Sequence, residues 1–239
     1  ELYLKARLEA KVEKVHFQCK DKDLRIQVVR PRNWKRDSRA YLELFIPRSR
    51  MAMVKEMDIE TVSADIDLAE GRGDVTLESV SGDIDVVGAM TSLELTSVSG
   101  TMRVTGTSPQ VKAETVSGDI HIQAEAARLN VASVSGTIRL GGIYDMADAS
   151  TTSGDIIINA RTNELDVSSV SGSIRAMQCQ GSIEGSTVSG DIRVEGGDIA
   201  DVGLGAVSGT IVFMASLQPD GEMAIGTKSG DIKVVLPAS

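Results

Sequence analysis

The sequence has few aromatic residues, and this shortage limits the kind of core that it can form. Phe, Trp and Tyr together make up 3% of the 239 residues, although 41% of the chain is hydrophobic. Wide globular cores use aromatic side chains to fill their volume, whereas a narrow core between close strands can be built from aliphatic side chains alone. We therefore expect a thin core of Val, Ile, Leu, Ala and Met.

Cysteine and long apolar runs are also scarce. The two cysteines, Cys19 and Cys179, are too few and too far apart for a disulfide framework or a cysteine-based metal site. We expect two ordinary thiols, with one long-range disulfide as the alternative. No apolar run is long enough for a transmembrane helix. Because the chain begins at Glu1 rather than Met, we expect an upstream segment to be missing, and a signal peptide or a membrane anchor would lie there.

Motifs that support catalysis are missing as well. The chain has no nucleophile elbow, phosphate-binding loop, zinc-ligand spacing or dinucleotide fingerprint. Its only histidines are His16 and His121. His16 has no recognisable Ser or Cys partner nearby, and His121 stands at an outward position that other repeats fill with Arg, which indicates a basic stripe rather than a catalyst. Asp83 and Asp85 share one face of a strand, as acids do in carbohydrate-active β-helix enzymes, but solvent-facing acids explain them equally well. We predict no enzymatic activity, no cofactor and no metal site, and keep a polysaccharide-acting enzyme as a weaker alternative.

What the sequence does contain is a repeat. The phrase Ser/Thr-Val-Ser-Gly-Asp/Thr-Ile recurs nine times, and a tenth copy at 61–66 carries Ala64 in the place of glycine. The glycines follow one another at 18 residues six times, and then at 19 and 21. They are Gly82, Gly100, Gly118, Gly136, Gly154, Gly172, Gly190, Gly209 and Gly230. A fixed period of this kind indicates an array in which each unit covers the apolar face of the next.

Each unit is numbered here from its glycine, which is position 0. Apolar residues recur at −7, −5, −2, +2 and +4, and their spacing by two on both sides of Ser-Gly indicates two short strands that meet at a corner. We expect the valine at −2, such as Val98, to fill the inside of this corner. We expect positions +5 to −8 to form connecting loops, with the extra residues of the two longer units before −7. These loops would be 105–110, 123–128, 141–146, 159–164, 177–182, 195–201 and 215–222.

The sequence therefore predicts an all-β fold, a single elongated β-solenoid (β-helix) of about ten 18-residue rungs. The left-handed hexapeptide solenoid needs an aliphatic residue at every sixth position. This sequence does not keep that pattern, because Val86 and Val98 are separated by Ser92. We therefore expect right-handed winding.

Position +1 alternates between an acid and a hydroxyl residue. Its aspartates are Asp83, Asp119, Asp155, Asp191 and Asp231, and the units between them carry Thr or Ser. Skipping one rung separates the carboxylates by about 10 Å, which is close to the Debye length in physiological salt. We interpret the alternation as a way to limit repulsion within a ladder of hydrogen-bonding side chains. The alternative is a cation-binding column, although the glycine-rich calcium repeat is absent.

The first 56 residues lack the period and differ in charge. Residues 1–56 carry 15 Lys/Arg against 8 Asp/Glu, a net charge of +7, and residues 57–239 carry 10 against 26, a net of −16. Strand-like runs lie at 2–8, 15–19, 24–29 and 41–46. We predict two domains, an irregular basic β cap at 1–56 and an acidic solenoid at 57–239, because an open first rung needs a cover.

One loop of this first segment is a candidate docking surface. Five cations flank a single tryptophan: Arg30, Arg32, Trp34, Lys35, Arg36 and Arg39 make up this docking loop. Basic residues beside Trp suit an anionic membrane interface or another polyanion. The alternative is a solvated hairpin loop with Trp34 folded back onto the cap. Nucleic acid is not expected as a partner, because the acidic solenoid would repel it.

The repeated Ser/Thr-Val-Ser-Gly-Asp-Ile phrase closely resembles the bacterial DUF4097 family over about 61–236, and Ile46-Pro47 resembles the family's lead-in to the first repeat. The family is often labelled adhesin-like. The resemblance implies a β-solenoid-like domain of an envelope-associated protein, often with a membrane segment elsewhere, and no catalytic residues.

We therefore expect a non-catalytic scaffold or binding module of the bacterial cell envelope or cell surface, with a link to envelope stress. The cytoplasmic face of the membrane is an alternative location. Expected partners are a protein, a membrane surface or a cell-wall polymer. The alternative function is a self-assembling, bactofilin-like solenoid that forms homo-oligomers through its terminal rungs.

Overall fold

The structure is a computed structural model, and it describes residues 3–8, 14–20, 23–29, 40–45 and 55–236. The chain divides into two units, residues 1–53 and 54–239. Every regular element among the described residues is a β-strand. None of those residues belongs to a helix that is long and apolar enough to cross a membrane.

The first unit contains two antiparallel strand pairs. β1 (Tyr3–Leu8) pairs with β4 (Ala40–Phe45), and β2 (Lys14–Lys20) pairs with β3 (Asp23–Val29). Each of the four strand-like runs expected from the sequence overlaps one of these strands. The capping role of this unit stays a prediction.

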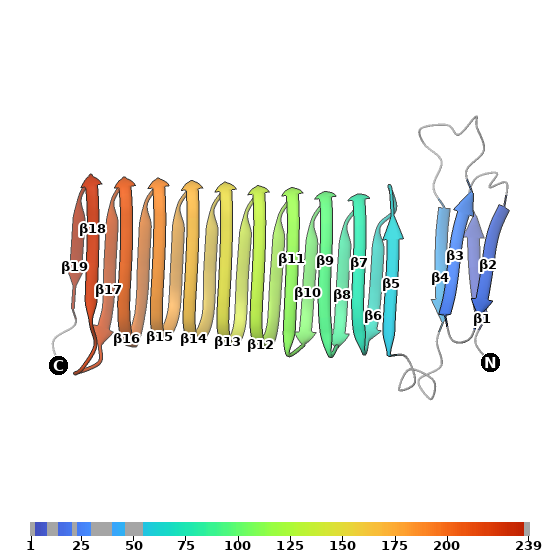
Figure 1. The fold of residues 1–239 in the computed structure, drawn as a ribbon, viewed down its shortest axis with the longest axis horizontal. Helices are drawn as coiled ribbons and strands as arrows, with labels where there is room; N and C mark the ends of the chain where they lie inside the picture. The colour runs from blue at the N-terminus through green and yellow to red at the C-terminus, as the bar shows by residue number, and fades with distance from the viewer. Residues whose placement is uncertain (1–2, 9–13, 21–22, 30–39, 46–54, 237–239) are drawn as a thin grey trace. The chain divides into compact units, whose positions relative to one another are not determined.

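The second unit is a stack of parallel strands (Figure 1). Its strands are β5 (Glu56–Thr61), β6 (Ile66–Gly71), β7 (Asp74–Ser81), β8 (Ile84–Ala89), β9 (Ser92–Ser99), β10 (Met102–Thr107), β11 (Gln110–Ser117), β12 (Ile120–Ser135), β13 (Ile138–Ser153), β14 (Ile156–Ser171), β15 (Ile174–Ser189), β16 (Ile192–Ser208), β17 (Ile211–Leu217), β18 (Met223–Ser229) and β19 (Ile232–Val235). The predicted all-β solenoid of about ten 18-residue rungs is confirmed. Its right-handed winding stays a prediction.

Successive rungs pair in register with the sequence period. Val111 of β11 pairs with Leu93 of β9 on one side and with Leu129 of β12 on the other, so each partner lies 18 residues away. The other layer behaves in the same way, since Met102 pairs with Ile84 and Ile120. The period is therefore the length of chain that returns a residue to the same place one rung further along the stack.

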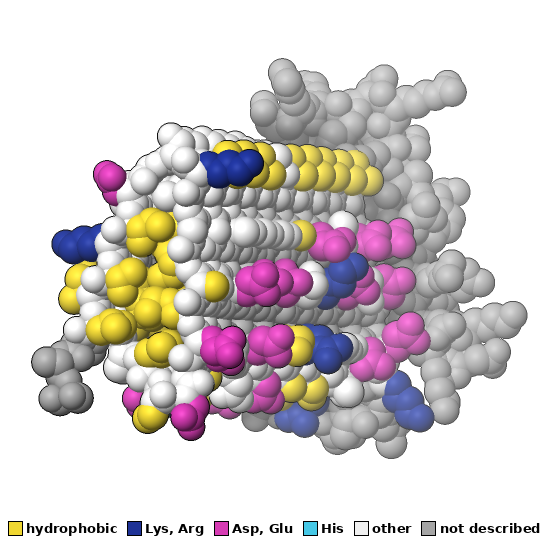
Figure 2. Space-filling view, turned by 60° about the vertical axis from the view of Figure 1, so that its left-hand side comes forward, with side chains coloured by type: hydrophobic (Ala, Val, Ile, Leu, Met, Phe, Trp, Pro, Cys, Tyr) yellow, Lys and Arg dark blue, Asp and Glu magenta, His cyan; other side chains and the backbone are white. Residues whose placement is uncertain are grey.

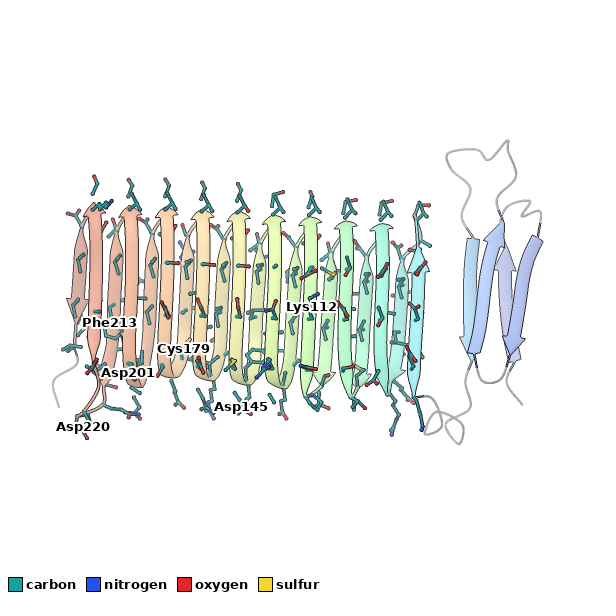
Figure 3. All side chains as sticks on the ribbon, in the orientation of Figure 1. Lys112, Asp145, Cys179, Asp201, Phe213 and Asp220 are labelled. Atoms are coloured by element: carbon teal, nitrogen blue, oxygen red, sulfur yellow. The ribbon has the colours of Figure 1, made fainter. Side chains whose placement is uncertain are left out.

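The core is the space between the two layers, and aliphatic side chains fill it. Positions −7, −5, +2 and +4 face inward, as expected, and Leu95, Ile120 and Ile138 have no exposed surface. Figure 3 shows these side chains stacked in rows from rung to rung, with the buried Phe213 among them near the last rungs. Each rung thus covers the apolar edge of its neighbour, as the repeat predicts.

The expectation of a connecting loop in every rung is wrong for the central part of the stack. β12 through β16 each run without interruption for 16 or 17 residues, through the segments expected to be loops. The chain bends there while its backbone still pairs with the rungs on both sides. Small buried residues such as Ala124 and Ala126 line these bends, and their low hydrophobicity hid the inward positions from a search for large aliphatic residues.

The extra residues of the two longer units lie before position −7, as predicted. In the 19-residue unit they form an irregularity where β15 pairs with β16, between Met177 and Ile183 on the β15 side. In the 21-residue unit they form a turn at 218–222, between β17 and β18. Insertions are accommodated on the side of the rung away from the Ser-Gly corner.

The last rung of the stack, made of β18 and β19, exposes apolar side chains. Met223, Ile232 and Val234 occupy inward positions, yet they are 37%, 45% and 42% exposed, whereas Ile211 and Phe213 one rung earlier have no exposed surface. Among the described residues, no strand pairs with the outer edge of either strand. The terminal rung is thus open in the described part of the chain, as the sequence suggested.

Candidate functional site

The docking loop predicted from the sequence lies outside the described residues. Arg30, Arg32, Trp34, Lys35, Arg36 and Arg39 all fall in the segment 30–39. Their role in binding stays a prediction, and the outer surface of the solenoid supplies the geometry that the structure does describe.

The corner glycines are required by contact between rungs. A Cβ atom on Gly136 would lie 2.1 Å from the carbonyl oxygen of Gly118 in the preceding rung, and one on Gly100 would lie 2.2 Å from that of Gly82. Gly100 and Gly136 also have φ angles of 130° and 137°, which L-residues rarely adopt. Ala64 is tolerated because β5 is the first strand of the stack in the described part of the chain, where no earlier rung contacts Ala64.

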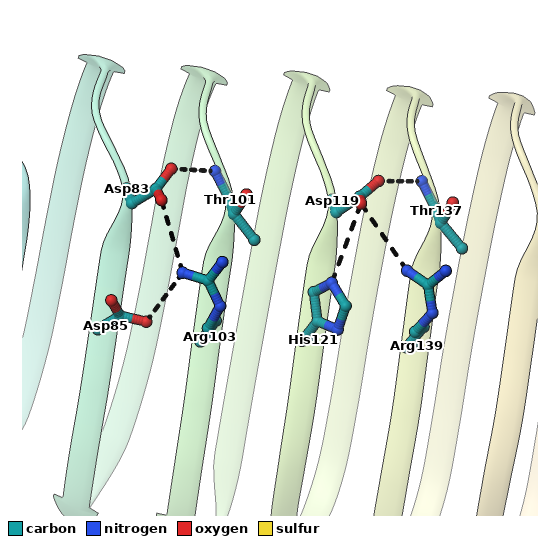
Figure 4. Close-up of polar contacts among 8 residues, drawn as sticks. All are labelled: Asp83, Asp85, Thr101, Arg103, Asp119, His121, Thr137 and Arg139. Atoms are coloured by element: carbon teal, nitrogen blue, oxygen red, sulfur yellow. Dashed lines mark hydrogen bonds and ion pairs between the residues drawn. The ribbon is translucent and has the colours of Figure 1, made fainter.

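The +1 aspartates bridge successive rungs. The Asp83 Oδ1 atom accepts a hydrogen bond from the backbone N–H of Thr101 at 2.8 Å, and Asp119 does the same for Thr137 at 2.8 Å (Figure 4). The same bond joins Asp155 to Ser173, Asp191 to Thr210 and, one rung before the regular alternation begins, Asp65 to Asp83. The carboxylate supplies an acceptor to an amide beside the glycine corner, where backbone pairing is interrupted.

Position +3, two residues further along each strand, forms an outward column rich in cations. Arg103 lies 3.5 Å from Asp83 and 3.4 Å from Asp85, and its contact with Asp85 raises the pKa of the guanidinium. One rung further, the His121 Nε2 atom lies 4.0 Å from the Asp119 Oδ2 atom (Figure 4). Burial lowers the pKa of His121, so its neutral form is favoured. The two aspartates and Arg103 form an exposed ion-pair network, and exposed pairs of this kind contribute little to stability.

A second polar column, which the sequence interpretation missed, lies at position −6 on the opposite layer. Lys112 bridges Glu94 at 3.0 Å and Glu114 at 3.2 Å, and its contact with Glu94 raises its pKa. Two rungs further, partial burial and the nearby Asp166 raise the pKa of Asp148. The pairing of β13 with β14 brings these two acids side by side. The 18-residue spacing alone was enough to find this column.

The valines at position −2 are exposed, which contradicts the expectation that they fill the corner. Val98 is 47% exposed and Val134 is 49% exposed. The alternation of the strand continues to position −3, so that −3 faces inward and −2 faces outward, and the alternation slips only at the Ser-Gly corner. We call this row the valine ladder: Val62, Val80, Val98, Val116, Val134, Val170, Val188 and Val207. Figure 2 shows a straight row of hydrophobic side chains along one edge of the stack.

The residue before most of these valines is a small buried Ser or Thr; Ala206 takes this place before Val207. Ser97 donates a hydrogen bond to the carbonyl of Ser99 at 3.2 Å, which satisfies the hydroxyl within its own corner. Among the described residues, the hydroxyls of Thr115, Ser133, Thr151, Ser169, Thr187 and Thr227 are buried without a hydrogen-bond partner. The corner therefore places a hydroxyl inside and a valine outside, the reverse of what hydrophobicity favours.

No cluster of three or more His, Cys, Asp or Glu side chains within the described residues is arranged to hold a metal ion. The carboxylates at +1 are instead used as hydrogen-bond acceptors and as partners of Arg103 and Arg139, the latter 3.8 Å from Asp119. The outer surface carries straight columns of side chains, and at positions such as +3 and −6 the side chain changes along the column.

The model of the Toastrack DUF4097 family matches this chain three times, over residues 9–128, 88–206 and 125–239. The three matches overlap and together extend from residue 9 to the end of the sequence. No curated protein and no solved structure matches the chain. A repeat solenoid of this kind fits a non-catalytic scaffold or binding module.

Proposed function

Since the chain belongs to the Toastrack DUF4097 family, we propose that it is a non-catalytic scaffold or binding module of the bacterial cell envelope. The observation that carries this proposal is the continuous stack of about ten rungs, whose outward positions form straight columns. Backbone hydrogen bonds between rungs hold the surface side chains at a fixed spacing of about 4.8 Å per rung. The surface side chains are therefore free to differ without changing the fold.

The columns supply variety on this regular frame. Position +3 carries in turn Asp67, Asp85, Arg103, His121, Arg139, Ile157, Arg175 and Arg193. An extended partner lying along the stack would meet a defined order of charges. Recognition by such a surface depends on electrostatic complementarity along its length, which favours a polymer or an elongated protein.

In this proposal, the docking loop attaches the protein to the envelope. Its five cations and Trp34 suit an anionic surface, and the net charge of −16 on residues 57–239 would be repelled by that surface. Attraction at the first unit and repulsion along the second would hold the solenoid away from the membrane or wall polymer. The acidic solenoid would then be the part that is displayed to partners.

The test is co-sedimentation of the chain with anionic liposomes and with isolated cell wall, at low and at high salt. The docking-loop variant carries Trp34→Ala with Arg32, Lys35 and Arg36 changed to Gln. The matched control changes three cations of the solenoid to Gln: Arg139, Arg175 and Arg193. We expect salt-sensitive binding that the docking-loop variant loses at least tenfold and the control keeps.

Two results would contradict this assignment. Binding that the control loses and the docking-loop variant keeps would transfer attachment to the solenoid. Absence of binding to both liposomes and cell wall would remove the envelope surface as the partner.

A second candidate function, self-assembly in the manner of bactofilin-like solenoids, is supported by the open terminal rung. Apolar inward side chains on an unpaired strand edge are a template for another β-strand. The expected result is concentration-dependent filaments in electron micrographs, lost in Ile232→Asp and kept in Val87→Asp, an exposed valine of β8. A chain of fixed size at all concentrations would count against this candidate.

A further inference from the structure

We infer that two copies of this chain pair side by side and antiparallel along the valine ladder. The first support is the exposure of the ladder itself. Eight valines in a row are 45–63% exposed, and they are interrupted only at the sixth rung, where Thr152 stands. Contiguous apolar surface of this kind on a soluble protein marks an interaction site.

Strand propensity does not require valine at these positions. Thr152 occupies the same place in β13 without interrupting the strand, and threonine is also β-branched and favourable in sheets. An outward threonine would leave the backbone unchanged and would remove the apolar row. The repeated choice of valine outside and hydroxyl inside is therefore explained by a partner that covers the valines.

The spacing of the ladder fits a second copy. The ten rungs from Val62 to Lys228 span nine steps of about 4.8 Å, a row about 43 Å long. A row on another copy has the same spacing, so the two rows can contact each other rung by rung along their whole length. A contact strip about 10 Å wide would bury on the order of 400 Å² on each copy, about half of a standard interface, so the dimer is expected to be weak.

Charges beside the ladder select the antiparallel arrangement. Position −4, on one side of the ladder, carries Glu60, Glu78 and Glu114 in the early rungs, but only Ala, Ser and Gly from rung five onward. A two-fold axis perpendicular to the rungs' stacking direction sets this column beside the same column of the partner, running the opposite way. The early glutamates then face the uncharged half of the partner, and Lys228 in the tenth rung lies opposite the first rung, close to Glu60.

Position +1, on the other side of the ladder, also favours the antiparallel arrangement. In the antiparallel register, rung two meets rung nine and rung four meets rung seven. Asp83 then lies opposite Thr210, and Asp119 lies opposite Ser173. The parallel alternative, with the two-fold axis along the stack, would instead place Glu78 beside the partner's Asp83 column. Like charges at that distance are destabilising. The antiparallel pair avoids them on both sides from rung two to rung nine, and sets like charges together only in the outermost rungs, where Asp65 lies opposite Asp231.

The first test is sedimentation equilibrium of the full chain from micromolar to about millimolar concentration. The disrupting variant is Val116→Lys with Val170→Lys, because these two positions face each other in the antiparallel register. The control is Val87→Lys, since Val87 is 54% exposed and lies outside the ladder. We expect the dimer dissociation constant to rise at least tenfold in the double variant and to stay within twofold in the control, with unchanged circular dichroism in both.

The second test fixes the direction of pairing by disulfide cross-linking in a Cys19→Ser background, where the other cysteine, Cys179, is buried. A mixture of Val62→Cys and Lys228→Cys chains should form the mixed dimer selectively. A preference for Val62–Val62 cross-links would overturn the antiparallel register. A chain that stays monomeric at all concentrations, or a dimer indifferent to Val116→Lys and Val170→Lys, would overturn the inference. Binding to neutral vesicles that the double variant loses would assign the ladder to a lipid surface instead.

Discussion

At the scale of single residues, the contact between successive glycines sets the closest approach of the rungs. The carbonyl of one corner glycine occupies the space in which the next would place a Cβ atom, about 2 Å away at Gly100 and Gly136. This explains why the phrase tolerates Ala only at its first occurrence, Ala64. The bend alone, which the sequence suggested as the reason for glycine, would not single out the first copy.

A glycine substitution separates this contact from general strand propensity. Gly136→Ala should lower the free energy of unfolding by about 3 kcal/mol or more, because backbone atoms must move and the φ of 137° is unfavourable for alanine. Gly205→Ala is the control, since a Cβ there meets nothing within 4 Å, and it should change stability by less than about 1 kcal/mol. Urea denaturation measures both, and equal losses would refute the contact between rungs as the cause.

The +1 carboxylates give a second prediction at this scale. Asp155→Ala removes the acceptor of the Ser173 amide, and losing one such bond is worth about 1 kcal/mol. Hydrogen exchange at Ser173 should become about fivefold to tenfold faster, while Asp155→Asn, which keeps a side-chain oxygen, should preserve protection. The Thr137 amide, held by Asp119, is the internal control. Unchanged exchange at Ser173 in the alanine variant would show that the bond is not protective.

Single residues also show which parts of the core could be predicted from the sequence and which could not. The spacing of Leu93, Leu95, Met102 and Val104 was sufficient to place the core, because all four are large, apolar and buried. It misplaced Val98, because hydrophobicity assigns valine to the inside unless the position of the slip in alternation is known. That slip is set by backbone geometry at the Ser-Gly corner, and a periodic pattern does not encode it.

At the scale of elements, the long strands β12 to β16 each bend while their backbone stays paired with the neighbouring rungs. The bend of β13 contains Tyr144, whose hydroxyl donates a hydrogen bond to the carbonyl of Gly141 at 2.5 Å. The bend of β15 contains the buried Cys179. The sequence interpretation assigned both segments to loops, since neither bend carries the aliphatic spacing of a strand.

These two buried groups predict a loss of stability at alkaline pH. Burial raises the pKa of Tyr144 to about 12 and that of Cys179 to about 11, from ordinary values of 10.0 and 9.0. The folded state keeps both protons longer, so the free energy of unfolding is unaffected below about pH 8.5 and falls as pH rises to about 12. Each shift of about two pKa units should account for a decrease of about 3 kcal/mol.

The measurement is the free energy of unfolding as a function of pH for the parent chain, Tyr144→Phe and Cys179→Ala. Cys179→Ala should flatten the decrease mainly between about pH 9 and 11, and Tyr144→Phe mainly between about pH 10 and 12. Parallel curves for all three proteins would show that these side chains do not titrate within the fold.

At the scale of the whole molecule, the stack is one-dimensional, because each rung contacts only its neighbours. A defect should therefore cost more in the middle of the stack than at its end. Gly154→Ala should unfold the region around β13 and β14, whereas Gly230→Ala, with an equally close backbone contact, should only release the last rung, β18 and β19. Hydrogen exchange followed rung by rung distinguishes the two, and equal global destabilisation would contradict one-dimensional behaviour.

At this scale, the all-β solenoid, the length of its rungs and their approximate number could be predicted from the sequence. A constant interval between glycines defines the rung, and the number of glycines defines the length of the stack. The candidate sites could be predicted less completely from the sequence. The docking loop was selected on composition alone, while the valine ladder depends on which of two adjacent residues, such as Ser97 and Val98, points inward.

The alternation at position +1 also bears on how the gene for such a chain can lengthen. Duplicating a single copy that carries aspartate at +1 would set two aspartates on adjacent rungs, as happens at the start of the array with Asp65 and Asp83. Duplicating two copies, which is twice 18 or 36 residues, keeps every later aspartate beside a threonine or serine. Unequal recombination would therefore be best tolerated when it adds or removes two repeats at a time.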